Sequence, residues 1–278
     1  MIIQYDDVPE YGKIFCNYLK SYVTKENTNK TEYHPYSELV VIRQGNIIYT
    51  ARRQTKRLSG KCVIYNRADT IHNQFVQYDH IYERYRVKFY AKDILSSSED
   101  GWLLSDVLKT SFVKEMCDED FDLIYALSKS IFEANRSEAL SELEKARMFI
   151  ELKLAILKTY TAPSRDTQHE ENYIIDVIKY IYEHLGENLK IEEIATLFFV
   201  SKSKLTYDFR AYCNMSIHEY ITLERIEKAK DLIENGYMIS AVAEMCGFSS
   251  SSYFIKVFSS ITGMTPLKYQ FSHAKGRN

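Results

Sequence analysis

Four consecutive serines at residues 249–252 combine a residue type and a spacing that suit anion binding. Apolar side chains follow them with the period of a helix that has one buried face. Serine can cap such a helix by accepting its free N–H groups. Short side chains also let the helix N-terminus, where the dipole is positive, come close to a phosphate. The predicted buried face holds Tyr253, Phe254, Val257 and Phe258, and the predicted open face holds Ser251, Ser252, Ile255 and Lys256.

This segment is the second copy of an internal repeat. Ala195 matches Ala243 at an offset of 48 residues, whereas Phe209 matches Phe258 at an offset of 49. We therefore expect one extra residue in the second copy, near the start of its second helix. Each copy has a short helix, a turn and a helix that begins at serine, which is the spacing of a helix-turn-helix motif. In the first copy the open face would hold Ser203, Thr206, Tyr207 and Arg210.

One long helix is predicted between the two copies, over residues 217–236, with Asn235-Gly236 as its stop signal. About 18 helical residues span about 27 Å, which can hold two recognition helices roughly one DNA turn of 34 Å apart. The net charge of the chain is −2, so no strong overall field directs it to nucleic acid. Residues 245–278 nevertheless contain only basic charges, at Lys256, Lys268, Lys275 and Arg277.

Residues 172–271 resemble the DNA-binding domain of AraC-type transcription regulators. The resemblance rests on "RIEKAKDLI" in the joining helix, on "GFSSSSYFIKVF" in the second motif and on "TGMTPLKY" after it. It implies two helix-turn-helix units in adjacent major grooves of double-stranded DNA, and RNA polymerase as a partner if the protein is an activator. The chain departs from the family at Tyr207, where a base-reading Arg is common, and at Ser250-Ser251, where Asp-Pro is common. Phe199 stands where the second copy has Gly247, which predicts a less regular first turn.

The predicted DNA contacts divide by chemistry. Lys256 is the one long donor on the open face of the second recognition helix and can reach guanine O6 and N7. Lys202, Lys204 and Arg210 are better suited to phosphates, which carry no sequence information. The full predicted set is Ser201, Lys202, Ser203, Lys204, Thr206, Tyr207, Arg210, Ser250, Ser251, Ser252, Ile255 and Lys256.

Residues 1–95 are rich in β-branched and aromatic residues and predict antiparallel strands. Residues 81–89 alternate between an apolar face and a face of Tyr82, Arg84, Arg86 and Lys88, which predicts a half-buried strand. Many AraC-type regulators carry a cupin-like jelly roll here that binds a small effector. In "HPYSELVVIRQG" Glu38 and Gly45 are spaced as in the first cupin motif, His34 falls on the place of its second metal-ligand histidine, and Glu32 replaces the first. "GKCVIYNRADTIHN", with His72, resembles the second motif.

Two readings of these polar residues remain open. His34, Glu38 and His72 could supply three ligands to a metal ion. The alternative is a barrel wall that hydrogen-bonds a polar ligand, and the degraded motif favours it, so no metal or cofactor is predicted. Tyrosine-rich barrels suit sugars and other polar small molecules. The predicted effector-binding residues are His34, Tyr36, Glu38, His72, Glu83 and Tyr85.

Residues 100–160 read as two helices around residues 135–137. Leu143, Ile150, Leu154 and Leu157 lie near heptad spacing, which predicts the seam of a homodimer. A helix that packs only on its own domain is the alternative. The expected fold is α+β, with an effector-sensing jelly roll at residues 1–95, a helical dimerisation region and linker at 96–165, and the DNA-binding domain at 166–278.

The sequence as a whole favours a cytoplasmic regulator. The five scattered cysteines lack any CxxC pair and predict reduced thiols. No signal peptide is visible, and no apolar run approaches the roughly 18 residues of a membrane span. A cupin-type metalloenzyme with a helical appendage is the alternative function. Because the sequence lacks GxSxG, HExxH and P-loop motifs, we expect no enzyme.

Overall fold

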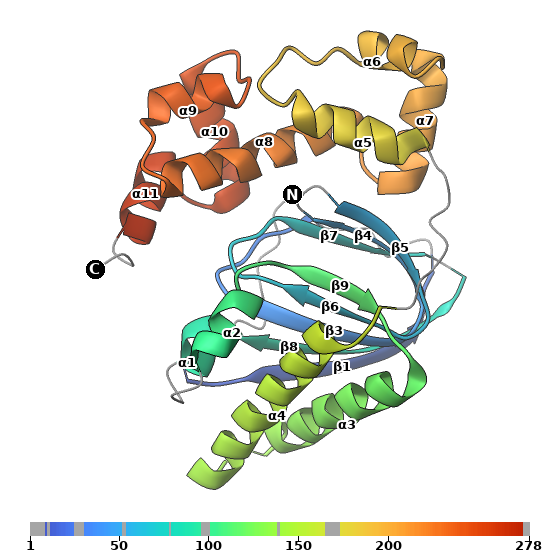
Figure 1. Cartoon of the computed structure of the whole chain (residues 1–278), viewed down its shortest axis with the longest axis vertical. Helices are drawn as coiled ribbons and strands as arrows, with labels where there is room; N and C mark the ends of the chain where they lie inside the picture. The colour runs from blue at the N-terminus through green and yellow to red at the C-terminus, as the bar shows by residue number, and fades with distance from the viewer. Residues whose placement is uncertain are drawn as a thin grey trace. The chain divides into compact units, whose positions relative to one another are not determined.

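The computed structural model describes residues 9, 12–24, 31–51, 54–77, 79–95, 101–137, 140–164 and 173–274 (Figure 1). The chain divides into two compact units, one mostly of residues 3–169 and the other mostly of residues 170–278. In the described parts, every strand lies before residue 116 and residues 173–274 hold only helices and turns, which makes the fold α+β as predicted. Residues 165–172, which the sequence places between the helical region and the DNA-binding domain, and the basic residues Lys275 and Arg277 lie outside the described residues.

The first unit is a jelly roll. Its strands are β1 (Phe15–Tyr22), β2 (Thr31–Glu32), β3 (Ser37–Gln44), β4 (Asn46–Ala51), β5 (Gln54–Ser59), β6 (Cys62–Asn66), β7 (His72–Val76), β8 (Ile81–Phe89) and β9 (Phe112–Glu115). Within the described residues they form one sheet of order β1-β8-β3-β6-β9 and a second of order β2-β7-β4-β5. Successive strands lie in different sheets except for β4 and β5 and for β8 and β9, and two such facing antiparallel sheets form a jelly roll.

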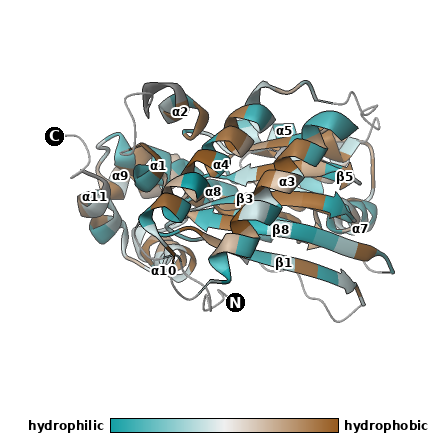
Figure 2. Ribbon diagram, turned by 90° about the horizontal axis from the view of Figure 1, so that it is seen from below, coloured by the Kyte–Doolittle hydropathy of each residue, from teal (hydrophilic) through white to brown (hydrophobic). Residues whose placement is uncertain are grey.

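Helices cover the outer face of the five-stranded sheet. They are α1 (Ala91–Leu95), α2 (Gly101–Val107), α3 (Asp118–Asn135) and α4 (Glu142–Thr161). Figure 2 shows α3 and α4 on this side of the sheet, where α3 packs on β1, β8 and β3 and α4 packs on α3. The core between helices and sheet contains Leu39, Val87, Phe121, Ile124 and Leu152.

This cover makes the prediction of a half-buried β8 wrong. Tyr85 and Val87 of β8 pack in the core under the helices. The opposite face points into the jelly roll, where Tyr82 and Lys88 are also buried. Polar residues alternate along β8 because they line the interior between the two sheets, and not because they face water.

Helix α4 begins with a capping box, in which Ser141 and Glu144 exchange hydrogen bonds between side chain and backbone. One face of the helix packs in the core of its own unit through Met148 and Leu152. Three residues of the predicted seam lie on the other face. They are Leu143, Ile150 and Leu154, which are 81%, 57% and 52% exposed. The fourth, Leu157, is partly buried against the core and does not belong to the exposed stripe.

The described C-terminal residues 173–274 form helices joined by turns. Its helices are α5 (Tyr173–Glu183), α6 (Ile191–Leu197), α7 (Lys202–Cys213), α8 (Ile217–Glu234), α9 (Ile239–Met245), α10 (Ser251–Thr262) and α11 (Pro266–Ala274). The two predicted helix-turn-helix copies are α6–α7 and α9–α10, and α8 joins them with 18 residues, as expected. None of the described helices combines the length and apolarity of a membrane span.

Candidate functional site

The two turns before α7 and α10 have the same backbone. Val200 N donates to Ala195 O and Phe248 N donates to Ala243 O, each at 3.0 Å. Phe199 and Gly247 both adopt a left-handed conformation, with φ of 56° and 73°. The less regular first turn predicted from Phe199 is therefore wrong.

Different surroundings explain why one turn uses phenylalanine and the other glycine. The Phe199 side chain is 96% exposed, so it meets no neighbour and the turn bears only the backbone cost of the left-handed conformation. A Cβ on Gly247 would lie 2.6 Å from the carbonyl oxygen of Leu185 and 2.7 Å from an Arg225 nitrogen. The second turn therefore requires glycine for space as well as for conformation.

Serine caps both recognition helices. Ser201 Oγ accepts from Lys204 N, and Ser250 Oγ accepts from Tyr253 N, both at 3.2 Å. Because these two caps are equivalent, the extra residue of the second copy is Ser249. It lies in the turn just before α10, near the start of the second helix as expected.

The open face of α7 is as predicted. Leu205 and Phe209 are fully buried, and the predicted DNA contacts on this helix are exposed. Lys202 Nζ lies 2.6 Å from Glu192 Oε1, and Lys204 Nζ lies 2.7 Å from Asp208 Oδ2. Exposed pairs of this kind are weak and can be exchanged for a phosphate. A hollow of about 550 Å³ is lined by Lys202, Ser203, Thr206, Tyr207, Arg210 and Ala211.

On the open face of α10, the lysine is not paired with a carboxylate of the described residues. Phe254 and Phe258 are fully buried, whereas the predicted contacts from Ser250 to Lys256 on the other face are exposed. Lys256 makes no ion pair with any residue that the structure describes. Tyr253 is 51% exposed and so does not belong to the buried face, contrary to the prediction, because it sits at the helix start beside the edge of that face. Both helices thus present N–H groups, hydroxyls and a long cation on one exposed side, which suits phosphates and base edges.

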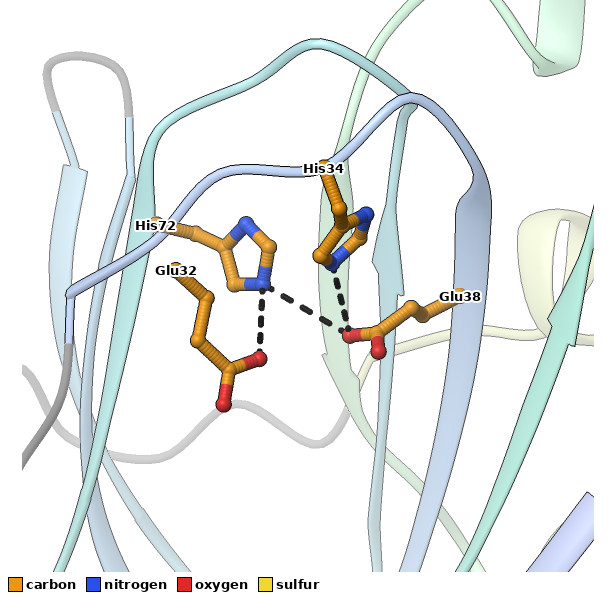
Figure 3. A group of neighbouring side chains, drawn as sticks. All are labelled: Glu32, His34, Glu38 and His72. Carbon is orange, nitrogen blue, oxygen red and sulfur yellow. Dashed lines mark ion pairs between the residues drawn. The ribbon is translucent and has the colours of Figure 1, made fainter. Parts of the chain in front are cut away.

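A second polar site lies inside the jelly roll. Glu32 ends β2 and is the register partner of His72 at the start of β7, so both come from the four-stranded sheet. Glu38 comes from β3 of the five-stranded sheet, and His34 lies just before it. Figure 3 shows the four side chains converging. His34 Nε2 lies 3.4 Å from Glu38 Oε2, and His72 Nε2 lies 3.6 Å from both Glu38 Oε2 and Glu32 Oε2.

The charged groups of this cluster shift one another's pKa values. Arg86 of β8 places Nη1 3.3 Å from Glu32 Oε2 and 3.8 Å from Glu38 Oε1. Burial raises the pKa of the two carboxyls, but Arg86 and the histidines outweigh it and hold the pKa of Glu32 at about 2 and that of Glu38 well below its usual range. Burial lowers the pKa of His72, but the two carboxylates outweigh it and raise the pKa to about 9.

The structure separates the predicted effector-binding residues into two groups. His34, Glu38 and His72 meet inside the roll, and Tyr36 stacks on His34 with ring centroids 4.0 Å apart. The other two, Glu83 and Tyr85, lie on the opposite face of β8, which corrects their predicted place in the same pocket. There Glu83 Oε1 accepts from the Tyr125 hydroxyl at 2.7 Å and from the Tyr18 hydroxyl at 3.2 Å, and Glu83 Oε2 lies 2.9 Å from Lys20 Nζ.

Sequence reasoning left Glu32 and Arg86 out of the predicted site. Glu32 occupies the position of the first ligand histidine in the cupin motif, and this position could have identified it as a site residue. Arg86 belongs to the polar face of β8, and the alternation of polar and apolar residues along this strand could have identified it. The cluster also reaches Asn66, whose amide nitrogen lies 3.5 Å from Glu38 Oε2 and whose amide oxygen accepts from the Tyr49 hydroxyl at 2.6 Å.

Comparisons with known proteins agree with the geometry of the second unit. A family model described as a helix-turn-helix domain matches residues 194–271. The probable transcriptional regulator LumQ of Photobacterium leiognathi is 36% identical over 33% of this chain and 38% of its own length. The xylose operon regulatory protein of Escherichia coli is 31% identical over 35% of this chain and 25% of its own length. The HTH-type transcriptional activator RhaR of Cronobacter sakazakii is 25% identical over 84% of this chain and 83% of its own length.

Proposed function

We propose that this chain is an AraC-type DNA-binding transcription regulator, not an enzyme, and that it reads a specific DNA sequence with α7 and α10 in response to a small polar effector. The observation that carries this proposal is the tandem arrangement of two serine-capped helices with exposed polar faces. Both present cations and free N–H groups, which contact phosphates and base edges in other DNA-binding proteins.

The two recognition helices have different proposed roles. On α7, Tyr207 is 74% exposed and occupies the readout position, and Lys202 and Lys204 are already paired with carboxylates. On α10, Lys256 is exposed one turn inside a serine-rich helix start. We therefore assign base readout mainly to α10 and phosphate contacts mainly to α7. The 18 residues of α8 span about 27 Å, which suits two successive major-groove segments.

The proposed effector site is the polar interior of the jelly roll. Tyr36, Tyr49 and Tyr82 are all buried on this side of the sheets, and tyrosine combines a stacking surface with a hydroxyl donor. One relative is a xylose operon regulatory protein, which agrees with a sugar as the effector. Residues 1–95 would sense this molecule and residues 166–278 would bind DNA.

Residues 96–165 are proposed to hold the dimer together through the exposed stripe of α4. The proposed location is the cytoplasm, where DNA is found and where RNA polymerase would be the partner of an activator.

Selection of DNA sites from a randomised library tests the proposal with the full-length chain. We expect one enriched sequence with two recognition segments about one helical turn apart. Addition of candidate sugars should change the affinity for that sequence. Recovery of no enriched sequence in any condition would contradict specific DNA recognition, and an affinity that no polar small molecule changes would contradict the sensing role.

A further inference from the structure

The spacing of the side chains of Glu32, His34, Glu38 and His72 inside the jelly roll is unusual for hydrogen-bonded partners. His72 Nε2 lies 3.6 Å from the nearest oxygens of Glu32 and Glu38. N–H···O hydrogen bonds have donor–acceptor distances of about 2.7–3.2 Å, so these contacts are too long. His72 is only 2% exposed, and its Nε2 makes no hydrogen bond to any described residue. A buried polar atom in this position calls for a partner.

Both histidine rings are held so that Nε2 points into the cluster. His34 Nδ1 lies 2.7 Å from the carbonyl oxygen of Tyr36, and His72 Nδ1 lies 3.0 Å from that of Thr70. A carbonyl oxygen can only accept, so Nδ1 carries the proton in each ring. In the neutral ring Nε2 then bears the lone pair, as in histidines that bind a metal ion and donate their other N–H to a carbonyl.

The donor atoms have the separations of a metal coordination sphere. One atom from each of Glu32, His34, Glu38 and His72 lies within 4.8 Å of the others, and three of the separations are 3.4, 3.6 and 3.6 Å. Zinc bonds of about 2.1 Å in a tetrahedron place neighbouring ligands about 3.4 Å apart. We propose that these four residues form a binding site for one divalent transition-metal ion, with Zn²⁺ as the ion that fits best.

The charges agree with a dication. Two carboxylates and Arg86 leave a net charge of −1 when both histidines are neutral, because Arg86 balances only one of them. A metal ion would balance this charge and give the buried His72 Nε2 a partner. Arg86 would then hold the Glu32 carboxylate in place, which is the usual role of a group that contacts a ligand from behind.

The ion would connect the two sheets of the jelly roll. Glu32 and His72 belong to the four-stranded sheet, whereas Glu38 belongs to the five-stranded sheet. A bond from one ion to both sheets would stabilise their packing, because the separated ligands of the unfolded chain offer no preformed site. Metal content would thereby become a property of the sensor unit that can be measured without DNA.

Metal analysis of the purified full-length chain tests this inference. After chelator treatment and addition of Zn²⁺, we expect about one tightly bound ion per chain and an unfolding midpoint raised by several degrees. Removal of a ligand in His72→Gln should lower Zn²⁺ affinity by at least about 100-fold, more than the loss of an outer contact. The matched control is His80→Gln, because His80 is exposed outside the cluster and its substitution should leave binding unchanged.

A second variant and a spectroscopic probe separate loss of the site from loss of the fold. Glu38→Gln keeps the shape of the side chain and should also abolish the rise of the midpoint. Co²⁺ should give visible absorption bands with the wild-type chain and His80→Gln, but not with either ligand variant. Equal metal uptake by His72→Gln and His80→Gln would overturn the proposal, as would a wild-type chain that retains no ion and shows no shift of its midpoint.

Discussion

Replacement of Gly247 by alanine should destabilise the C-terminal unit far more than the same change at the equivalent position of the first motif. An alanine at φ 73° bears a cost of about 1–2 kcal/mol for the left-handed conformation. Its Cβ would also lie 2.6 Å from the Leu185 carbonyl oxygen, so backbone must move. Overpacking of this kind costs about 1–3 kcal/mol, and the reduced entropy of the unfolded chain returns about 0.4–1 kcal/mol.

The net loss is about 1–4.6 kcal/mol, a large part of the roughly 5–15 kcal/mol that is typical of a folded domain. Phe199→Ala is the matched control. Phe199 already bears the left-handed conformation and its side chain is 96% exposed. Its removal should change stability by no more than about 0.5 kcal/mol. Both free energies of unfolding are measured by urea unfolding of the full-length chain, and the transition is monitored with a spectroscopic signal that reports on the helical unit.

The comparison refutes the reasoning if Gly247→Ala stays within about 0.5 kcal/mol of the wild type, or if Phe199→Ala loses as much. The first outcome would mean that the backbone of the turn can shift to accommodate the Cβ atom without a loss of stability. The second would mean that the Phe199 side chain stabilises the unit, although it is exposed. Because Gly247 fixes the turn that orients α10, we also expect Gly247→Ala to weaken DNA binding by the second motif.

The remaining predictions concern assembly and DNA binding. Leu154→Glu should convert a dimer to monomers in analytical ultracentrifugation, because a charge buried in the α4 seam has no partner; a wild-type chain that is monomeric at every concentration, with effector and on DNA, would contradict it. The fragment of residues 168–278 should fold and bind DNA alone, with log affinity falling against log salt by about 0.9 per neutralised phosphate; salt-independent binding would argue against phosphate contacts. Lys202→Ala should weaken binding evenly across sequences and reduce that slope by about one phosphate, because the exposed pair with Glu192 is easily exchanged; a changed sequence preference would contradict the assignment.

The helical unit was largely predictable because its signals are local. The buried positions of α7 and α10 follow from the apolar period, and the caps follow from serines at the helix starts. The position of Ser249 was harder to assign, because an offset of 48 or 49 residues aligns either serine with Ser201. Only the hydrogen bond from Tyr253 N to Ser250 Oγ decides which serine is the cap.

The jelly-roll site was predictable only in part. Motif spacing identified His34, Glu38 and His72, which the fold does bring together. The alternation of β8 revealed two faces but not which of them is the interior. That choice depends on α3 and α4, which cover the sheet from a distant part of the chain. Glu83 and Tyr85 were therefore assigned to the wrong side, and Arg86 was overlooked.

The measurement that tests the central claim most directly is site selection from randomised DNA with the wild-type chain and Lys256→Ala. Lys256 is exposed on α10 and pairs with no carboxylate in the described part of the chain. A lysine on a guanine edge contributes about 1–3 kcal/mol of discrimination. We predict that Lys256→Ala relaxes the preference at one base pair of the segment bound by the second motif and leaves the rest of the selected sequence unchanged. A uniform loss of affinity with an unaltered sequence preference would contradict the assignment of Lys256 to a base.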